Sequence, residues 1–224
     1  MSESDDELSL CPTTISALQE FLKEKEKREK QLTDVFQSNQ LLDVSFEEDW
    51  VINQKLEDIS YQLSQFWYDE NTANTIVKGA INSTPIDGKI ALISCPTLYT
   101  KLKRTCGERQ VILLEYDPRF TVFGSDFMLY DYKFPLNVPR DLYNIFDLVV
   151  ADPPFLSDEC LTKMAVTIKL LSKNKIVLCT GAIMMNLVEK LLDAKKCNFI
   201  PIHKNNLANE FYCYSNFDFD EMLK

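Results

Sequence analysis

Hydrophobic residues follow two spacings in this chain, and the two alternate from about residue 70 onward. Short apolar runs without polar alternation predict buried strands, and longer segments with apolar residues three and four apart predict amphipathic helices. The predicted strands are 89–94, 111–115, 127–131, 146–151, 175–180, 198–203 and 210–216. The predicted helices are 70–82, 97–105, 158–171 and 183–194.

This order of elements predicts an α/β fold. Strands that alternate with helices form a mostly parallel sheet, here of seven strands, with helices on both faces. The last two predicted strands have little chain between them, which indicates an antiparallel hairpin at one edge. We expect residues 1–60 to form an acidic N-terminus and a helical extension, and residues 61–224 to form the α/β domain.

Acidic residues outnumber basic ones, which narrows the choice of partners. The chain has 224 residues and a formal net charge of −10. An acidic surface repels a phosphate backbone, so we expect a basic protein rather than nucleic acid as partner, although ordinary solubility explains the charge equally well. The fully charged run 23–30 predicts a solvated helix with Glu–Lys pairs, and a nucleic-acid-binding arm is the alternative.

Seven cysteines, an odd number with no Cys-x-x-Cys pair, predict buried thiols of a reducing compartment rather than disulfides or a zinc site. The single histidine, His203, has no nearby set of ligands, so we expect no metal. The N-terminus lacks the apolar core of a signal peptide, and no run approaches the roughly 20 apolar residues of a membrane helix. We therefore expect a cytoplasmic or nuclear monomer without membrane contact, with the cytoplasm preferred.

The motif Asp152-Pro153-Pro154-Phe155 comes directly after the predicted strand 146–151. A carboxylate, two prolines and an aromatic ring at a strand end predict a stiff pocket lip. Asp152 and a proline carbonyl can accept hydrogen bonds from an amine while Phe155 packs beside it. The motif therefore indicates a site that holds an NH₂ group, and the alternative is a turn that only ends the strand.

Acidic residues end two further predicted strands. Glu115 ends the strand 111–115, and Asp131 ends the strand 127–131. Ligands of parallel sheets bind beyond the carboxyl ends of the strands, where an acid commonly grips ribose hydroxyls. For each of these acids, Asp152 included, capping of a helix N-terminus is the alternative.

Three adjacent aromatic residues precede the first of these helices, in Gln65-Phe66-Trp67-Tyr68. Three rings in a row cannot all face the core from one strand. Part of this segment is therefore a candidate lid over a ligand, and plain packing against the core is an equal alternative.

Together these motifs resemble those of class I S-adenosylmethionine-dependent methyltransferases that act on amino groups and have a Rossmann-like fold. More closely, the chain resembles the eukaryotic elongation factor 1A lysine methyltransferase 1 family, formerly labelled N6-adenine-specific DNA methyltransferase 2-like. The resemblance runs from about residue 60 to the C-terminus, is weaker in the N-terminal helix, and makes residues 61–224 the methyltransferase domain. It rests on Gln65-Phe66-Trp67-Tyr68, Phe120, Tyr130-Asp131-Tyr132, and residues 150–155, 178–182 and 206–211.

The resemblance implies a protein-lysine N-methyltransferase that moves a methyl group from S-adenosyl-L-methionine to a lysine of elongation factor 1A. The implied catalytic residues are Asp152, Pro153 and Phe155, and the implied substrate-binding residues are Pro154, Phe155, Asn206, Asn209 and Glu210. The implied cofactor residues are Phe66, Trp67, Ser94, Cys95, Pro96, Glu115, Asp131, Tyr132 and Asp152. Within this set Glu115 would bind the ribose hydroxyls, and Asp131 with Tyr132 would lie at the adenine.

One departure concerns the turn after the first predicted strand, which is rich in glycine in most class I enzymes. Here the turn, Ser94-Cys95-Pro96, contains no glycine. This departure motivates one alternative, a non-catalytic cofactor-binding protein. The other alternative is an N6-adenine methyltransferase on nucleic acid, in which the same motif would hold the exocyclic amine and Phe155 would stack on a flipped base.

Overall fold

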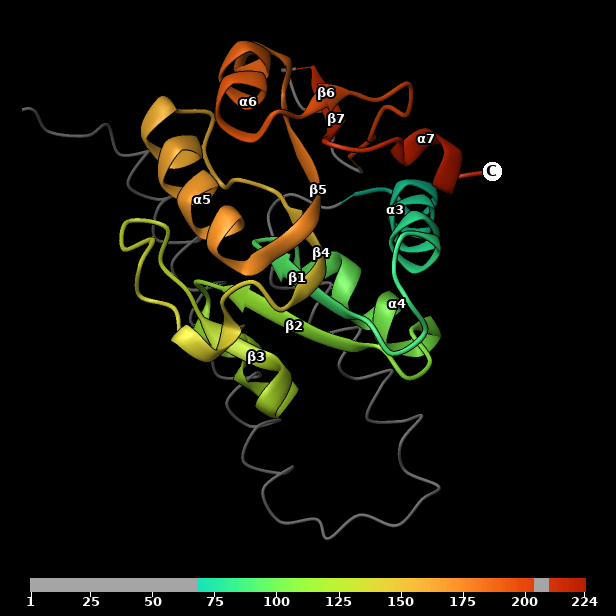
Figure 1. The fold of residues 1–224 in the computed structure, drawn as a ribbon, viewed down its shortest axis with the longest axis vertical. Helices are drawn as coiled ribbons and strands as arrows, with labels where there is room; N and C mark the ends of the chain where they lie inside the picture. Colours follow the sequence, from blue (N-terminus) through green and yellow to red (C-terminus); the bar gives the residue numbers. More distant parts are fainter. Residues whose placement is uncertain (1–67, 204–209) are drawn as a thin grey trace, which may run out of the picture. The chain divides into compact units, whose positions relative to one another are not determined.

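The computed structural model describes residues 68–203 and 210–224, and the structural statements below concern these residues. They form a seven-stranded sheet with helices packed against it (Figure 1). The strands are β1 (Lys89–Ile93), β2 (Gln110–Glu115), β3 (Phe127–Leu129), β4 (Phe146–Ala151), β5 (Ser172–Gly181), β6 (Lys195–Lys196) and β7 (Phe211–Ser215). The helices are α3 (Glu70–Asn82), α4 (Pro96–Thr105), α5 (Asp158–Leu171), α6 (Met185–Leu192) and α7 (Phe219–Met222), with 3-10 segments η1 (Pro118–Asp126), η2 (Arg140–Leu142) and η3 (Ala182–Met184).

The strand order in the sheet is β3-β2-β1-β4-β5-β7-β6. The strands from β3 to β5 are parallel, and β7 is antiparallel to both β5 and β6. The chain moves outward from β1 to β3 and then returns to place β4 on the other side of β1. The order therefore reverses between β1 and β4, and ligands of such sheets bind at this switch point. The predicted α/β fold, with a mostly parallel sheet and an antiparallel edge, is confirmed.

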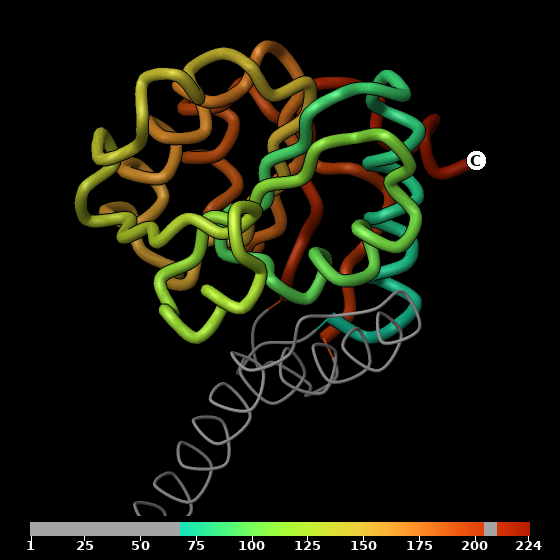
Figure 2. The backbone as a smooth tube through the Cα atoms, turned by 90° about the horizontal axis from the view of Figure 1, so that it is seen from below, coloured from blue at the N-terminus to red at the C-terminus, as the bar shows by residue number. Residues whose placement is uncertain are grey.

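Helices cover both faces of the sheet, which explains why its strands lack polar alternation. The pair α5 and α6 lies on one face, and the pair α3 and α4 lies on the other (Figures 1 and 2). Successive residues of β1 point to opposite faces. Ala91 and Ile93 accordingly pack into the core with α5 and α6, and Ile90 and Leu92 face the other way, all four being fully buried.

The predicted strand 198–203 is wrong, because the edge strand is β6, which ends at Lys196 and pairs with β7. Pro201 has no N–H group to give to a sheet ladder. The backbone N–H groups of the first two residues of the segment donate to the Asp220 carboxylate instead, at 2.8 and 3.1 Å. The antiparallel hairpin at the edge is nevertheless present, with a shorter first strand.

Other boundaries also differ from the predicted ones. The predicted helix 183–194 is divided into η3 and α6, and α6 ends where Asp193 adopts a left-handed backbone with φ 51°. The predicted strand 127–131 ends at Leu129. The boundary predicted at residue 60 lies outside the described residues. Within the described part of the chain, no helix combines the length and the apolar character that crossing a bilayer requires.

Gly79 lets α3 pack closely against α7. A methyl group at this position would lie 2.4 Å from the ring of Phe219 and 2.8 Å from a methyl group of Leu223. The Phe219 ring is fully buried and has little room to move. We therefore expect Gly79→Ala to lower the free energy of unfolding by about 1–2 kcal/mol, although alanine is the better helix former.

Urea denaturation of a double-mutant cycle checks this expectation. In a Phe219→Ala background the ring is gone, so Gly79→Ala should be neutral or should stabilise the protein by up to about 1 kcal/mol. An equal loss in both backgrounds would show that the contact with Phe219 is not the reason for the glycine.

Candidate active site

Four strand ends are held side by side by backbone hydrogen bonds that continue the sheet beyond its strands. The Asp152 N–H donates to the last carbonyl of β1 at 3.0 Å, and the Ser94 N–H donates to the Leu114 carbonyl of β2 at 2.9 Å. The Tyr130 N–H, which follows β3, donates to the Glu115 carbonyl at 3.0 Å. The residues predicted at these strand ends are therefore neighbours around the switch point of the sheet.

The Asp152 side chain accepts a hydrogen bond from a residue that lies far from it in the sequence. The Tyr68 hydroxyl donates to Asp152 Oδ2 at 2.6 Å, and Tyr68 is only 4% exposed. The capping alternative for Asp152 is wrong, because Ser157 caps α5 by accepting from the Cys160 N–H. The strand does end at Ala151, so the motif both ends β4 and presents a carboxylate.

The surroundings of Asp152 disfavour its charged form. The pKa of Asp152 is raised to about 7, mainly because the carboxylate is withdrawn from water; the Tyr68 hydrogen bond lowers this pKa and the Glu115 charge raises it. Burial, and then the Asp152 charge, raise the pKa of Tyr68 and of the Cys95 thiol well above their usual values. A strand-end carboxyl group with a pKa near 7 can change its charge at physiological pH, which is typical of functional sites.

Glu115 ends β2 at the place predicted for a ribose-binding acid. Its Oε1 accepts from the N–H groups of Tyr116 and Asp117 at 2.8 and 3.4 Å. Burial raises the pKa of Glu115, and these two N–H groups oppose the rise. Oε2 has no hydrogen-bond partner among residues 68–203 and 210–224, so the carboxylate can still accept from the paired hydroxyls of a ribose.

Asp131 and Tyr132 come next along the edge, after β3. Asp131 Oδ1 accepts from the Lys133 N–H at 2.9 Å, which makes a local turn. The Tyr132 ring packs edge-on against the Phe155 ring, with 5.8 Å between the centroids. This contact joins the predicted adenine side of the site to the predicted acceptor side. Phe155 is 57% exposed, so its ring remains open to a ligand.

The turn after β1 has a conformation that glycine ordinarily provides. Ser94 has φ 56°, in the left-handed region that other residues rarely adopt. Cys95 then precedes α4 without a capping side-chain bond, and Pro96 occupies the first turn, where an N–H is not needed. Residues in this region often cluster at ligand sites, and they also end helices, as Asp193 does. The turn therefore keeps a glycine-like backbone, and the missing glycine does not argue against a cofactor here.

The remaining predicted residues differ in exposure, and some of them lie outside the described residues. Pro153 is buried, and Pro154 is exposed. Glu210 lies at the same edge of the sheet, where its carbonyl accepts from the Ala182 N–H at 2.8 Å. One of its carboxylate oxygens, Oε2, already accepts from the Tyr212 hydroxyl at 2.8 Å. Four other predicted residues lie outside the described residues: Phe66, Trp67, Asn206 and Asn209.

Two residues of the site, Tyr68 and His203, are not among the predicted site residues, although Tyr68 ends the aromatic run that was a candidate lid. They form a β-bridge, and their ring centroids are 5.1 Å apart. Burial lowers the pKa of His203, which favours its neutral form, against the charge of Asp69. Two features of the sequence point in this direction: the aromatic run that ends at Tyr68, and the fact that a buried acid at a strand end needs a hydrogen-bond partner. Neither of these observations identifies the pair.

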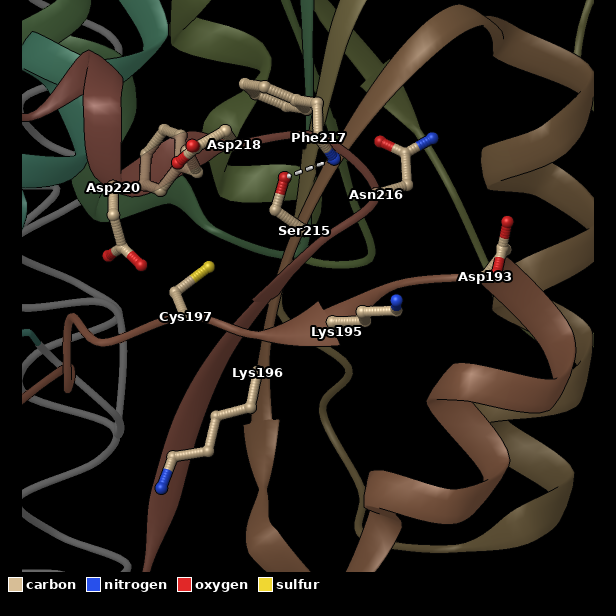
Figure 3. Close-up of a pocket in the computed structure, with 10 residues that line it drawn as sticks. Asp193, Lys195, Lys196, Cys197, Ser215, Asn216, Phe217, Asp218 and Asp220 are labelled. Atoms are coloured by element: carbon tan, nitrogen blue, oxygen red, sulfur yellow. Dashed lines mark hydrogen bonds between the residues drawn. The ribbon is translucent and has the colours of Figure 1, made fainter.

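A separate pocket of about 380 Å³ lies beyond β7, toward the amino end of the sheet (Figure 3). β7 is antiparallel to β5 and ends at Ser215 beside Val177, so the residues after it lead away from the edge described above. Two of the three acids that line this pocket serve the fold: Asp218 caps α7, and Asp220 accepts from the N–H groups of the chain after β6. Within the described part of the chain, no group of His, Cys, Asp and Glu side chains could hold a metal ion.

The raised pKa of Asp152 has a consequence for stability. An unfolded aspartate has a pKa near 3.9, so between about pH 4 and about pH 7 the folded protein binds more protons than the unfolded chain. The free energy of unfolding therefore falls as the pH rises through this window. Asp152→Asn has no such titration. We therefore expect the free energy of unfolding of the variant, relative to that of the wild type, to be higher at about pH 8 than at about pH 5 by about 2 kcal/mol.

Urea denaturation at the two pH values provides the measurement. Asp147→Asn is the matched control, because Asp147 lies on β4, which leads to Asp152, but accepts from Lys173 Nζ and from the Lys89 N–H, both at 2.8 Å. Loss of this paired charge should bring no such gain. A difference between wild type and Asp152→Asn that does not change with pH would contradict the raised pKa.

Comparison with known proteins leads to the same family as the motifs at the strand ends. Residues 59–219 match the family described as "Probable N6-adenine methyltransferase". A Gallus gallus protein named EEF1A lysine methyltransferase 1 is 48% identical over 97% of this chain and 98% of its own length. Proteins of the same name from Mus musculus and Homo sapiens are 45% and 42% identical, over 97% and 96% of this chain and 95% of each relative. The resemblance in the motifs is thus confirmed along nearly the whole chain, which belongs to the EEF1A lysine methyltransferase 1 family of S-adenosylmethionine-dependent methyltransferases.

Proposed function

We propose that this protein transfers a methyl group from S-adenosyl-L-methionine to the side-chain nitrogen of a lysine in elongation factor 1A. One observation carries the proposal: a carboxylate, Asp152, stands at the switch point of a methyltransferase sheet with its Oδ2 bonded to Tyr68. Its Oδ1 has no hydrogen bond to any described residue, so it can accept from an amine. The names of the relatives supply the acceptor protein.

Family membership makes the chain an enzyme that uses S-adenosyl-L-methionine. The carboxyl edge of the sheet fits this cofactor. Glu115 offers a carboxylate oxygen to the ribose, and Asp131 and Tyr132, at the next strand end, lie where the adenine would bind. Ser94, whose backbone is left-handed, forms the turn between these residues and Asp152. When bound, the cofactor supplies a methyl group on a positively charged sulfur, which a neutral amine can attack.

Asp152 and Pro153 hold the acceptor nitrogen. A lysine ammonium, whose pKa is near 10.4 in water, has no lone pair with which to attack, so the amine must be neutral at the moment of transfer. The Asp152 carboxylate accepts one N–H of that amine, and the Pro153 carbonyl accepts a second. Two acceptors fix the direction of the lone pair, and positioning of this kind provides most of the rate.

Phe155 contacts the stem of the lysine side chain in this proposal. Its ring is exposed and is held edge-on by Tyr132. The four methylene groups of a lysine pack well on such a ring, and the ring face also attracts the cation before it loses its proton. Phe155 therefore orients the lysine along the direction that leads to Asp152.

The proposed partner is a protein and not a nucleic acid, and the net charge of −10 supports this choice. The alternative acceptor, the N6 amine of adenine, fits the same motif, but the names of the relatives do not favour it. We also propose that the protein acts in the cytoplasm as a monomer. The six cysteines of the described residues are all free and buried, which supports a reducing compartment.

Asp152→Ala removes the acceptor proposed for the amine. We expect transfer of labelled methyl groups to purified elongation factor 1A to fall by at least about 100-fold. Asp147→Asn, a change on the strand that precedes Asp152, should retain the transfer of the wild type. Unchanged transfer by Asp152→Ala would exclude the role given to this residue, and labelling of adenine in oligonucleotides instead of the protein would establish the alternative acceptor.

Glu115→Gln tests the ribose site, since the amide accepts more weakly than a carboxylate. We expect the dissociation constant for S-adenosyl-L-methionine, measured by calorimetry, to rise about 10-fold, which corresponds to the loss of one hydrogen bond to a charged group. Glu159→Gln is the control, because Glu159 is exposed on α5 and pairs with Lys163. An unaltered affinity of Glu115→Gln would remove Glu115 from the ribose site.

A further inference from the structure

A tyrosine just before the first described helix is built into the site. The Tyr68 hydroxyl reaches Asp152 Oδ2 at 2.6 Å, although 84 positions separate the two residues. We infer that Tyr68 is a positioning residue for the methyl transfer, which fixes the Asp152 carboxylate so that its other oxygen faces the acceptor amine. This inference rests on the proposed function of Asp152 and extends it.

Backbone contacts hold Tyr68 in this position. Tyr68 forms a β-bridge with His203, and the N–H of the next residue, Asp69, donates to the Ile202 carbonyl at 2.8 Å. The Ile202 N–H in turn donates to Thr72 Oγ1 at 2.9 Å. Asp69 also caps α3 by accepting from the Thr72 N–H at 2.7 Å. The start of α3 and the segment at His203 are thus tied together at the point where Tyr68 enters the site.

Ring contacts restrict the side chain as well. The His203 ring lies 5.1 Å from the Tyr68 ring and 4.7 Å from the Phe211 ring, between centroids. Phe211 begins β7 and pairs with Gly181, so this aromatic stack leads from Tyr68 to the edge of the sheet. Packed rings of this kind keep one rotamer. The hydroxyl is therefore aimed at Asp152 by its surroundings, and the bond it makes, to a carboxylate, is of the strong kind.

Other titratable groups face the pair, and those among the described residues include no lysine or arginine. Those that face Tyr68 or Asp152 are Glu115 on β2, Cys95 after β1 and Cys179 on β5. The neutral His203 ring, beside Asp69, faces Tyr68 from the other side. No lysine or arginine of residues 68–203 and 210–224 is bonded to Asp152. The Tyr68 hydroxyl is therefore the group in this part of the chain that stabilises the negative charge of Asp152.

Tyr68→Phe keeps the ring and removes only the hydroxyl. The titration midpoint of Asp152, followed by its ¹³C carboxyl signal in the full-length protein without cofactor and assigned with Asp152→Asn, should move to higher pH by about one unit. Tyr99→Phe is the matched control, because Tyr99 donates to a different aspartate, Asp126, at 2.7 Å. The control should leave the Asp152 midpoint in place, and an unchanged midpoint in Tyr68→Phe would overturn the inference.

Turnover provides a separate readout. In Tyr68→Phe we expect kcat with elongation factor 1A to fall roughly 10-fold with little change in KM, because an interaction that acts in the transition state is lost. Wild-type kcat in this variant would overturn the positioning role. If the wild type itself does not methylate elongation factor 1A, the proposed function fails, and the titration still decides whether Tyr68 controls Asp152.

A measurement on the wild type covers the case in which Tyr68→Phe does not fold. The ring Cζ signal of Tyr68 should move with the same midpoint as the Asp152 carboxyl signal, because protonation of the carboxylate weakens the hydrogen bond between them. A Tyr68 signal that stays constant through the titration of Asp152 would overturn the inference.

Discussion

β1 is hydrogen-bonded to a parallel strand on each side, and the arrangement of the site depends on this pairing. Its register places Ile93 beside Leu114 of β2 and beside Ala151 of β4. Parallel strands that end at the same level release the chain at one edge of the sheet. Residues that lie far apart in the sequence, such as Ser94 and Asp152, are therefore placed at the same edge by the pairing of the backbone, and no contact between their side chains is needed.

The same pairing puts a carboxylate where folding disfavours a charge. A buried charge persists only when it is paired or hydrogen-bonded, and the partner of Asp152 is a neutral hydroxyl. An arginine or lysine in place of Tyr68 would hold the pKa of Asp152 below its usual range and would occupy the carboxylate more fully. The tyrosine instead leaves this pKa near 7. The fold thus accepts a less stable arrangement at the place where the proposed reaction needs an acceptor for the amine.

Most of the fold could be predicted from the sequence, because buried parallel strands are continuous apolar runs and their order follows from the alternation with helices. The strand predicted at 198–203 failed for a physical reason: its N–H groups are taken by the Asp220 carboxylate, which is distant in the sequence. The positions of Asp152 and Glu115 at strand ends could be predicted because the apolar runs before them are recognisable. The partner of Asp152 could not, because the position of Tyr68 depends on its bridge to His203, a tertiary contact that no local pattern encodes. The left-handed backbone of Ser94 could not be predicted for a similar reason, because it depends on the strand pairing around this residue and not on the local sequence.

The geometry also bears on whether Asp152 removes a proton from the lysine or only orients its nitrogen. With a pKa near 7, Asp152 is a stronger base than an ordinary aspartate, yet it remains more than three units below a lysine in water. Proton transfer from the ammonium to Asp152 is then uphill by about 4–5 kcal/mol, unless the site lowers the lysine pKa by a similar amount. An orienting acceptor needs no such transfer, only a carboxylate held in one direction. The Tyr68 bond to Oδ2 provides that direction and leaves the other oxygen for the amine. Orientation of a lysine that has already lost its proton is therefore the role that this arrangement favours.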